Sequence, residues 1–273
     1  MTPSLASRFR DVKIAGIVNV TRDSFSDGGR YFAPEDAIAH ARFLMEDGAD
    51  LIDLGPASSH PKAESVPAEE EIRRLTEVAD ALLADGIPLS VDSPLGETQL
   101  WAAARGFAQI NDIRGLPDPE VNRRLADYDC DLVVMHSIQR GVRADIQEKD
   151  PAQVVAGVHD YFETRIQELT DAGIARDRLI LDPGMGYFLG DGPPPSIAML
   201  QDLPRLHRHF ELPLYVSVTR KSFLGKLTGR PTERRGAATL AAEIYAVAQG
   251  TNWIRTHDAG ALKDACRVQA VLQ

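Results

Sequence analysis

Short runs of apolar and β-branched residues recur along the chain, and each is followed by a segment with amphipathic helical spacing. The runs predict strands at residues 13–19, 50–54, 88–92, 108–112, 131–136, 179–182, 213–218 and 252–255, because such runs are typical of strands buried on both faces. Helices are predicted at residues 34–47, 68–84, 95–105, 119–128, 151–172, 196–210, 237–249 and from residue 259 onward. Proline at a helix start and glycine after a helix end support these assignments.

Eight strand–helix units in succession predict an α/β protein with a parallel sheet. A (β/α)₈ TIM barrel is the compact closed arrangement for that number of units. No stretch has the composition of a linker, so a single domain spanning residues 1–273 is expected. An open doubly wound sheet is the alternative, and it is less favoured because two halves require a boundary that the sequence does not contain.

Composition narrows the classes of partner. The chain has 273 residues, 44% of them hydrophobic, and a net charge of −10 from 30 basic and 40 acidic residues. An acidic protein has no general attraction for nucleic acid or an anionic membrane, so neither is expected as a partner. The two cysteines, Cys130 and Cys266, are far apart and lack metal-site or disulfide spacing. Because no signal-like or membrane-spanning run is present, a cytoplasmic location is expected.

Polar residues follow nearly every predicted strand. In a barrel all parallel strands end at one mouth, where such enzymes hold their active sites. The residues that should meet there are Asn19, Asp53, Asp92, Asn111, His136, Asp182, Lys221, Arg255 and His257. One such residue alone is better explained as a helix cap or a turn. So many at corresponding positions favour a common site.

Two carboxylates and an amide indicate what this site binds. Asp92, Asn111 and Asp182 at the floor of an apolar barrel suit a flat heterocycle that presents ring N–H and amino donors beside a carbonyl. The alternative for Asp182 is that its carboxylate binds only its own Pro-Gly turn.

Basic residues gather after the last two predicted strands, where barrels often hold phosphate. Lys221, Ser222, Arg255 and His257 therefore predict an anion-binding cluster within an otherwise acidic protein. Lys221 has two alternatives, a solvated loop lysine and a Schiff-base nucleophile.

Hard oxygen ligands lie after the first predicted strand. Asn19, Asp23 and Asp27 suit Mg²⁺ that is held largely by water and a substrate phosphate. The segment Asp27-Gly28-Gly29 is equally typical of an ordinary turn.

These residues lie in motifs that follow one another along the chain: Asn19-Val-Thr-Arg-Asp-Ser-Phe-Ser-Asp-Gly-Gly29, Val91-Asp92, Asn111-Asp112-Ile113, Leu181-Asp-Pro-Gly184, Arg220-Lys-Ser-Phe223 and Arg255-Thr-His257. Together they resemble dihydropteroate synthase, the pterin-binding (β/α)₈ enzyme of folate biosynthesis. The resemblance implies condensation of 6-hydroxymethyl-7,8-dihydropterin diphosphate with 4-aminobenzoate to 7,8-dihydropteroate and diphosphate. It also implies Mg²⁺ as cofactor and a homodimer, the common state of the family.

The resemblance assigns roles by position in this sequence. The pterin-binding residues would be Asp92, Asn111, Met135, Asp182 and Lys221, all but Met135 also catalytic. The diphosphate-binding residues would be Asn19, His60, Arg255 and His257, with Asn19 also binding the metal. The aminobenzoate-binding residues would be Phe25, Ser59, Pro61, Phe188 and Ser222. The implied mechanism is dissociative, because loss of diphosphate leaves a cation that the pterin ring delocalises.

Two loops depart from the usual family pattern. Residues 57–61 read Ala-Ser-Ser-His-Pro where relatives have Ser-Thr-Arg-Pro, so His60 stands where a diphosphate-binding arginine is usual. Residues 185–190 read Met-Gly-Tyr-Phe-Leu-Gly, without a common lysine and with added aromatic bulk. Both features resemble the sulfonamide-insensitive, mobile-element-borne branch of the family. We hypothesise that Tyr187 or Phe188 narrows the aminobenzoate end, so that a bulkier sulfonamide clashes. The alternative is that both aromatics simply pack under the loop.

Two other functions remain open. A pterin-dependent methyltransferase of related fold would keep Asp92, Asn111 and Asp182 but would need no diphosphate cluster and no Mg²⁺. A non-catalytic pterin-binding paralogue is the second, and His60 in place of arginine is the feature that favours it.

Overall fold

A computed structural model of the chain describes residues 4–20, 33–57, 66–138 and 150–273. Most of the predicted site residues lie inside these ranges. Those that lie outside the described residues are Asp23, Phe25, Asp27, Ser59, His60 and Pro61.

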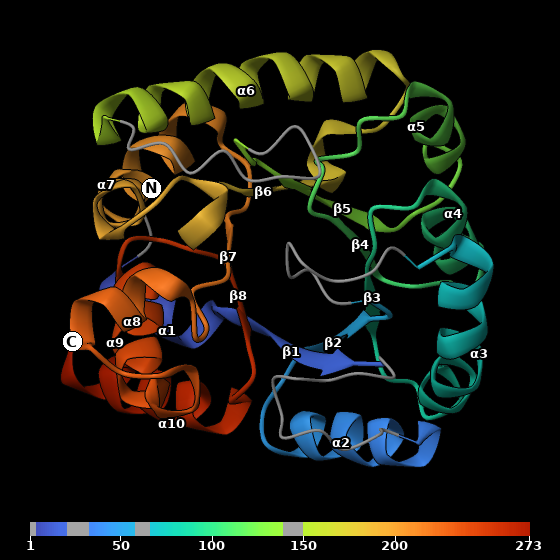
Figure 1. Cartoon of the computed structure of the whole chain (residues 1–273), viewed down its shortest axis with the longest axis horizontal. Helices are drawn as coiled ribbons and strands as arrows, with labels where there is room; N and C mark the ends of the chain where they lie inside the picture. Colours follow the sequence, from blue (N-terminus) through green and yellow to red (C-terminus); the bar gives the residue numbers. More distant parts are fainter. Residues whose placement is uncertain (1–3, 21–32, 58–65, 139–149) are drawn as a thin grey trace.

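The described strands form one parallel sheet that curves into a barrel (Figure 1). They are β1 (Lys13–Asn19), β2 (Leu51–Gly55), β3 (Leu89–Asp92), β4 (Gln109–Asp112), β5 (Asp131–Met135), β6 (Leu179–Asp182), β7 (Tyr215–Val216) and β8 (Trp253–Thr256). Their order is β6-β5-β4-β3-β2-β1-β8-β7. A parallel bridge between Leu181 and Leu214 joins β6 to the segment that enters β7, which brings the two ends of the sheet together. The predicted TIM barrel is confirmed, and the open doubly wound alternative is wrong.

Strand β7 is shorter than the predicted range 213–218. It spans Tyr215–Val216, because these two residues alone pair with β8, and the β6 side is joined through a single bridge at Leu214. The closure of the barrel is therefore weakest beside the loop that carries Lys221.

The helices surround the strands (Figure 1). They are α1 (Leu5–Asp11), α2 (Pro34–Glu46), α3 (Ala68–Ala84), α4 (Gly96–Ala104), α5 (Pro119–Leu125), α6 (Pro151–Asp171), α7 (Pro193–Phe210), α8 (Ser222–Thr228), α9 (Gly236–Ala248) and α10 (Ala259–Leu272). Helices α1 and α8 have no counterpart in the sequence prediction, because seven residues are too few for helical periodicity to be recognised; α5 is as short, but Pro119 at its start marks it. No helix in the described ranges combines the length and the apolar composition that crossing a membrane requires.

Inside the barrel an apolar layer supports a polar one. Ala15, Leu51, Val133, Ile180 and Tyr215 form a separate buried cluster, against which Trp253 packs. Because side chains of a strand alternate, the residue two positions further along points to the same side. Those residues include Asp53 on β2, Met135 on β5, Asp182 on β6 and Arg255 on β8. The carboxyl ends of the strands therefore carry mainly polar and charged side chains, directly above the apolar layer.

Candidate active site

A buried arginine joins two strands at the centre of the polar layer. The Nε of Arg255 donates a hydrogen bond to Oδ2 of Asp53 at 2.5 Å, and its Nη2 donates to Oδ2 of Asp92 at 2.7 Å. The side chain of Asp53 is 0% exposed, and those of Asp92 and Arg255 are 12% and 16% exposed. An ion pair removed from water in this way requires good geometry on both sides, so the three residues form one unit.

The pKa of the Asp92 carboxyl is raised towards neutral pH. Burial raises its pKa to about 6; the Arg255 cation opposes this shift, and the Asp53 anion adds to it. The Lys221 cation also lowers the pKa of Asp92, so the two side chains lie close enough for their charges to interact. A carboxyl with this pKa can hold or release a proton near neutral pH.

Asp182 is buried in the turn that follows β6. Its Oδ1 accepts a hydrogen bond from the backbone N–H of Gly184 at 2.8 Å, and Gly184 has a φ of +74°, which favours glycine. Burial raises the pKa of Asp182 to about 6, against the Gly184 N–H and the Lys221 and Arg255 cations. The carboxylate therefore binds its own turn through one oxygen and also interacts electrostatically with the Lys221 and Arg255 cations.

Lys221 is the second buried cation near Asp92 and Asp182, beside Arg255. Burial lowers its pKa to about 8, and the Asp182 anion opposes this shift. The Nζ lies 4.7 Å from the centre of the Phe188 ring, a cation–π arrangement. Ser222 follows as the first residue of α8. A Cβ at Gly186 would lie 3.5 Å from the Lys221 Cδ and from the Ser222 Oγ, so the residues after β6 and after β7 are close neighbours.

His257 follows β8 beside the same cations. Its Nδ1 is hydrogen-bonded to Oγ1 of Thr219 at 2.9 Å. Burial lowers the pKa of His257 to about 3, and the cations of Arg220, Arg255 and Lys221 lower it further. The ring is therefore neutral near neutral pH, with a fixed orientation set by Thr219. Sequence analysis did not identify Thr219, whose role depends on a contact between two loops.

Three other predicted residues lie at or next to the ends of their strands. Asn111 and Met135 are 4% and 5% exposed. Among the described residues, Oδ1 of Asn111 has no hydrogen-bond partner, and a buried acceptor of this kind suits a donor from a ligand. Asn19 ends β1, and a Cβ at Gly55 would lie 3.1 Å from its Oδ1. Glycine at position 55 thus leaves space for the Asn19 amide.

The described residues include no group of three or more His, Cys, Asp or Glu side chains arranged to hold a metal ion. Asn19 offers one hard oxygen at the mouth. This suits Mg²⁺, which keeps several waters and uses one or two protein oxygens together with substrate phosphate.

Hydrogen bonds behind the site fix the tips of β3 and β4. Gln99 donates through Nε2 to the Ser93 carbonyl at 2.8 Å and to Oδ2 of Asp112 at 3.0 Å. Ser93 also donates to Oε2 of the buried Glu71 at 2.6 Å. Because Ser93 and Asp112 directly follow Asp92 and Asn111, this network holds the backbones that carry them.

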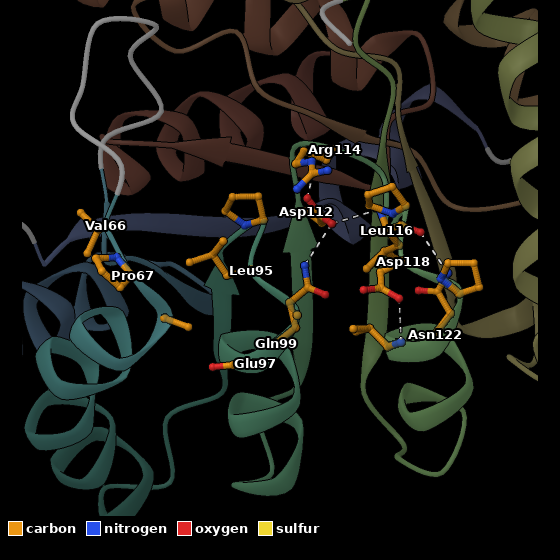
Figure 2. A pocket seen from close by; sticks show the side chains of 16 residues that line it. Val66, Pro67, Leu95, Glu97, Gln99, Asp112, Arg114, Leu116, Asp118 and Asn122 are labelled. Atoms are coloured by element: carbon orange, nitrogen blue, oxygen red, sulfur yellow. Dashed lines mark hydrogen bonds between the residues drawn. The ribbon is translucent and has the colours of Figure 1, made fainter. Parts of the chain in front are cut away.

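A cavity of about 700 Å³ lies beside this network, at the starts of α3, α4 and α5 (Figure 2). Its lining includes Val66, Leu95, Gln99, Asp112, Arg114 and Asn122. None of the residues predicted to bind substrate lines it. The charged cluster inside the barrel is therefore separate from this outer cavity.

Comparison with known proteins agrees with the class that the barrel and its buried acid–base cluster define. The sequence profile of a family described as pterin binding enzyme matches residues 15–257. The chain therefore has the fold and the family features of a pterin-binding (β/α)₈ enzyme.

More specific relatives narrow the family. The chain is 53% identical over 260 residues to dihydropteroate synthase type-2 of Escherichia coli, covering 95% of this chain and 96% of the relative. It is 48% identical over 260 residues to the type-3 protein of the same organism, covering 95% and 99%. The chain belongs to the dihydropteroate synthase family, whose members are transferases. The predicted resemblance is confirmed.

Solved structures agree. Dihydropteroate synthase of Xanthomonas albilineans with 4-aminobenzoic acid has a TM-score of 0.87 and 39% identity, covering 97% of this chain and 94% of that one. The same enzyme in complex with 7,8-dihydropteroate has a TM-score of 0.84 and 38% identity, covering 97% and 95%.

Proposed function

We propose that the chain condenses 6-hydroxymethyl-7,8-dihydropterin diphosphate with 4-aminobenzoate, forming 7,8-dihydropteroate and diphosphate. The observation that supports this most directly is the grouping of Asp92 and Asp182 with Lys221 and Arg255 in one buried site. Anions beside the ring would stabilise a pterin cation, while cations would stabilise the departing diphosphate. The relatives named above contribute the substrate class, because one was solved with 4-aminobenzoic acid and one with 7,8-dihydropteroate.

Each residue has a part in that reaction. Asn111 and Asp182 would accept hydrogen bonds from the pterin ring, and Met135 would pack against it. Arg255 would bind diphosphate through the guanidinium N–H donors that are not bonded to Asp53 or Asp92. Neutral His257 would donate a hydrogen bond to a diphosphate oxygen through Nε2 if its Nδ1 accepts the Thr219 hydroxyl proton. Apolar walls around the cation would exclude water until the amine attacks.

Mg²⁺ fits the mouth beside Asn19 as the cofactor of this reaction, where it would neutralise diphosphate charge when bound. The support is chemical, since an amide oxygen is a hard ligand and the remaining ligands would be water and substrate oxygens. The predicted roles of Phe25, Ser59, His60 and Pro61 concern residues outside the described ranges and stay predictions.

The decisive assay measures diphosphate release by the purified protein with Mg²⁺, the pterin diphosphate and 4-aminobenzoate. Aminobenzoate-dependent release is expected, and Asp92→Asn should abolish most of it. Absence of aminobenzoate-dependent release, together with tight pterin binding, would favour the non-catalytic paralogue. Methyl transfer to or from a bound pterin would instead favour the methyltransferase.

Reduced sulfonamide sensitivity is proposed for the same site, with Phe188 as its cause. The Phe188 ring lies against Lys221 at 4.7 Å, whereas the neighbouring Tyr187 is 46% exposed. Phe188→Ala should therefore lower the sulfonamide inhibition constant by about tenfold or more, and Tyr187→Ala should change it little. If the wild type and Phe188→Ala had the same low sulfonamide inhibition constant, this idea would be contradicted.

A second copy of the chain is proposed as its partner. Apolar side chains remain exposed on the last two helices: Tyr245 on α9 is 40% exposed, and Val268 on α10 is 57% exposed. Val247 and Leu262 on the same helices are buried, so they belong to the core. Light scattering should report twice the chain mass of 29.8 kDa, and a monomer at high concentration would contradict the proposal. The cytoplasmic location stays a prediction.

A further inference from the structure

Arg220 has a backbone conformation that arginine rarely adopts. Its φ is +53°, in the left-handed region. A residue other than glycine costs free energy there and remains only where its surroundings hold it in place. Arg220 directly precedes Lys221 and Ser222. The direction in which the chain leaves Arg220 therefore decides where the Lys221 and Ser222 side chains point.

Thr239 of α9 and Arg235, the residue before that helix, both bind the Arg220 backbone. The Arg220 N–H donates to Oγ1 of Thr239 at 3.0 Å, and Thr239 is 5% exposed. The Arg220 carbonyl accepts from Nη1 of Arg235 at 2.9 Å. Arg235 precedes α9, and its own carbonyl accepts from the Thr239 N–H at 2.8 Å. The start of α9 thus binds both the N–H and the carbonyl of the strained residue Arg220.

A glycine in α8 makes room for this arrangement. A Cβ at Gly225 would lie 2.2 Å from Nη2 of Arg235 and 2.4 Å from its Cζ. Those distances are far inside van der Waals contact, so any side chain at position 225 would displace the guanidinium. Nε of Arg235 also donates to the Arg230 carbonyl at 3.0 Å. The guanidinium therefore links both ends of the segment that contains α8 to α9.

We propose that Arg235 and Thr239 are positioning residues for the reaction, which orient Lys221 and Ser222 by holding Arg220 in its left-handed conformation, and that Gly225 provides the space this requires. The inference rests on the proposed function for the roles of Lys221 and Ser222. Arg235 itself acts through the backbone of Arg220 and contacts no predicted substrate-binding side chain among its hydrogen bonds. If the Arg220 backbone relaxes, the Lys221 ammonium moves away from Phe188 and Asp182 towards water.

Two variants break the arrangement from opposite sides. Arg235→Gln removes the donor, and Gly225→Ala pushes the intact guanidinium away. Each has a matched control in the same segment. Arg234→Gln changes the neighbouring arginine, which is exposed. Gly236→Ala adds a Cβ that would meet nothing within 4 Å.

Steady-state kinetics with both substrates should separate positioning from stability. Arg235→Gln and Gly225→Ala should each raise the KM of both substrates by about tenfold, the usual effect of one lost charged hydrogen bond. The controls should stay within about twofold of the wild type. The alkaline limb of the kcat/KM profile should also move to higher pH in both variants. The reason is that a solvated Lys221 regains a higher pKa than the value of about 8 that burial imposes.

The outcomes separate the inference from the proposed function. If the wild type is active and both variants keep its KM values and alkaline limb, the positioning role is wrong. A fall in kcat alone, in step with a lower Tm, would mean that Arg235 only stabilises the fold, and would also overturn the proposal. If the wild type releases no diphosphate, the proposed function fails. Calorimetric pterin affinity of the same four variants then tests the arrangement, since Lys221 is one of the predicted pterin ligands.

Discussion

Asp182→Asn should make the protein more stable while it removes pterin binding. Asp182 is 4% exposed, and its Oδ1 accepts the Gly184 N–H at 2.8 Å. The Asn amide has the same shape, and its oxygen can accept the same hydrogen bond. What the substitution removes is a buried negative charge, whose pKa burial raises from 3.8 to about 6.

The magnitude follows from that shift. A difference of about 2 pKa units corresponds to about 3 kcal/mol of free energy of unfolding. Because the folded pKa is the higher one, the folded state binds the proton more tightly. The resulting stability is complete below the unfolded pKa of 3.8 and is lost as the pH rises through the folded value of about 6. Wild-type Asp182 therefore destabilises the fold by about 2–3 kcal/mol near pH 7, and asparagine does not.

Urea unfolding of both proteins at about pH 7 and about pH 4.5 measures the effect. Asp182→Asn should be more stable near neutral pH, and its advantage should fall by more than half at the acidic pH. Asp264→Asn is the control, because the Asp264 side chain is 78% exposed. A variant less stable than the wild type at neutral pH, or an advantage independent of pH, would refute the reasoning. Unchanged pterin affinity in calorimetry would refute the assigned role.

Further predictions concern neighbouring residues and the metal. Asp53→Asn should lower the pKa of Asp92, which the Asp53 anion raises, so the acidic limb of the kcat/KM profile should move to lower pH. Gly184→Ala should destabilise by about 2 kcal/mol or more, because φ is +74° and the Cβ would lie 2.4 Å from the His136 carbonyl oxygen; Gly157→Ala, which would meet nothing within 4 Å, should show no loss in thermal unfolding. Removal of Mg²⁺ with a chelator should abolish diphosphate release and leave the melting temperature unchanged, and full activity without divalent ions would contradict the proposed cofactor.

The local pattern of apolar and polar residues was sufficient to predict the barrel, because each strand–helix unit has its own apolar run and its own helical periodicity. The predicted strand at residues 13–19 matches β1 (Lys13–Asn19), and the predicted range 179–182 matches β6 (Leu179–Asp182). The same logic placed Asp92 and Asp182 at strand ends, and parallel strands must end at one mouth. The extent of β7 was not predictable in this way, since it depends on how the sheet closes between β6 and β7.

Contacts between segments far apart along the chain could not be predicted from the sequence. Asp53 was recognised only as a polar strand end, yet it binds Arg255, which lies 202 positions away along the chain. The Thr219–His257 hydrogen bond and the Arg235–Arg220 contact likewise join separate loops. Nothing in the local pattern distinguishes Arg235 from the exposed Arg234 beside it.

The order of apolar runs and polar strand ends thus determined the barrel, the face that carries the site and the kinds of side chain that meet there, because alternation and helical periodicity are local properties. The tertiary structure alone decided which carboxylate pairs with which cation, how far each pKa moves and which loop backbone is held under strain. Those quantities depend on distances and on exclusion of water, and both arise only when the eight units close around one interior.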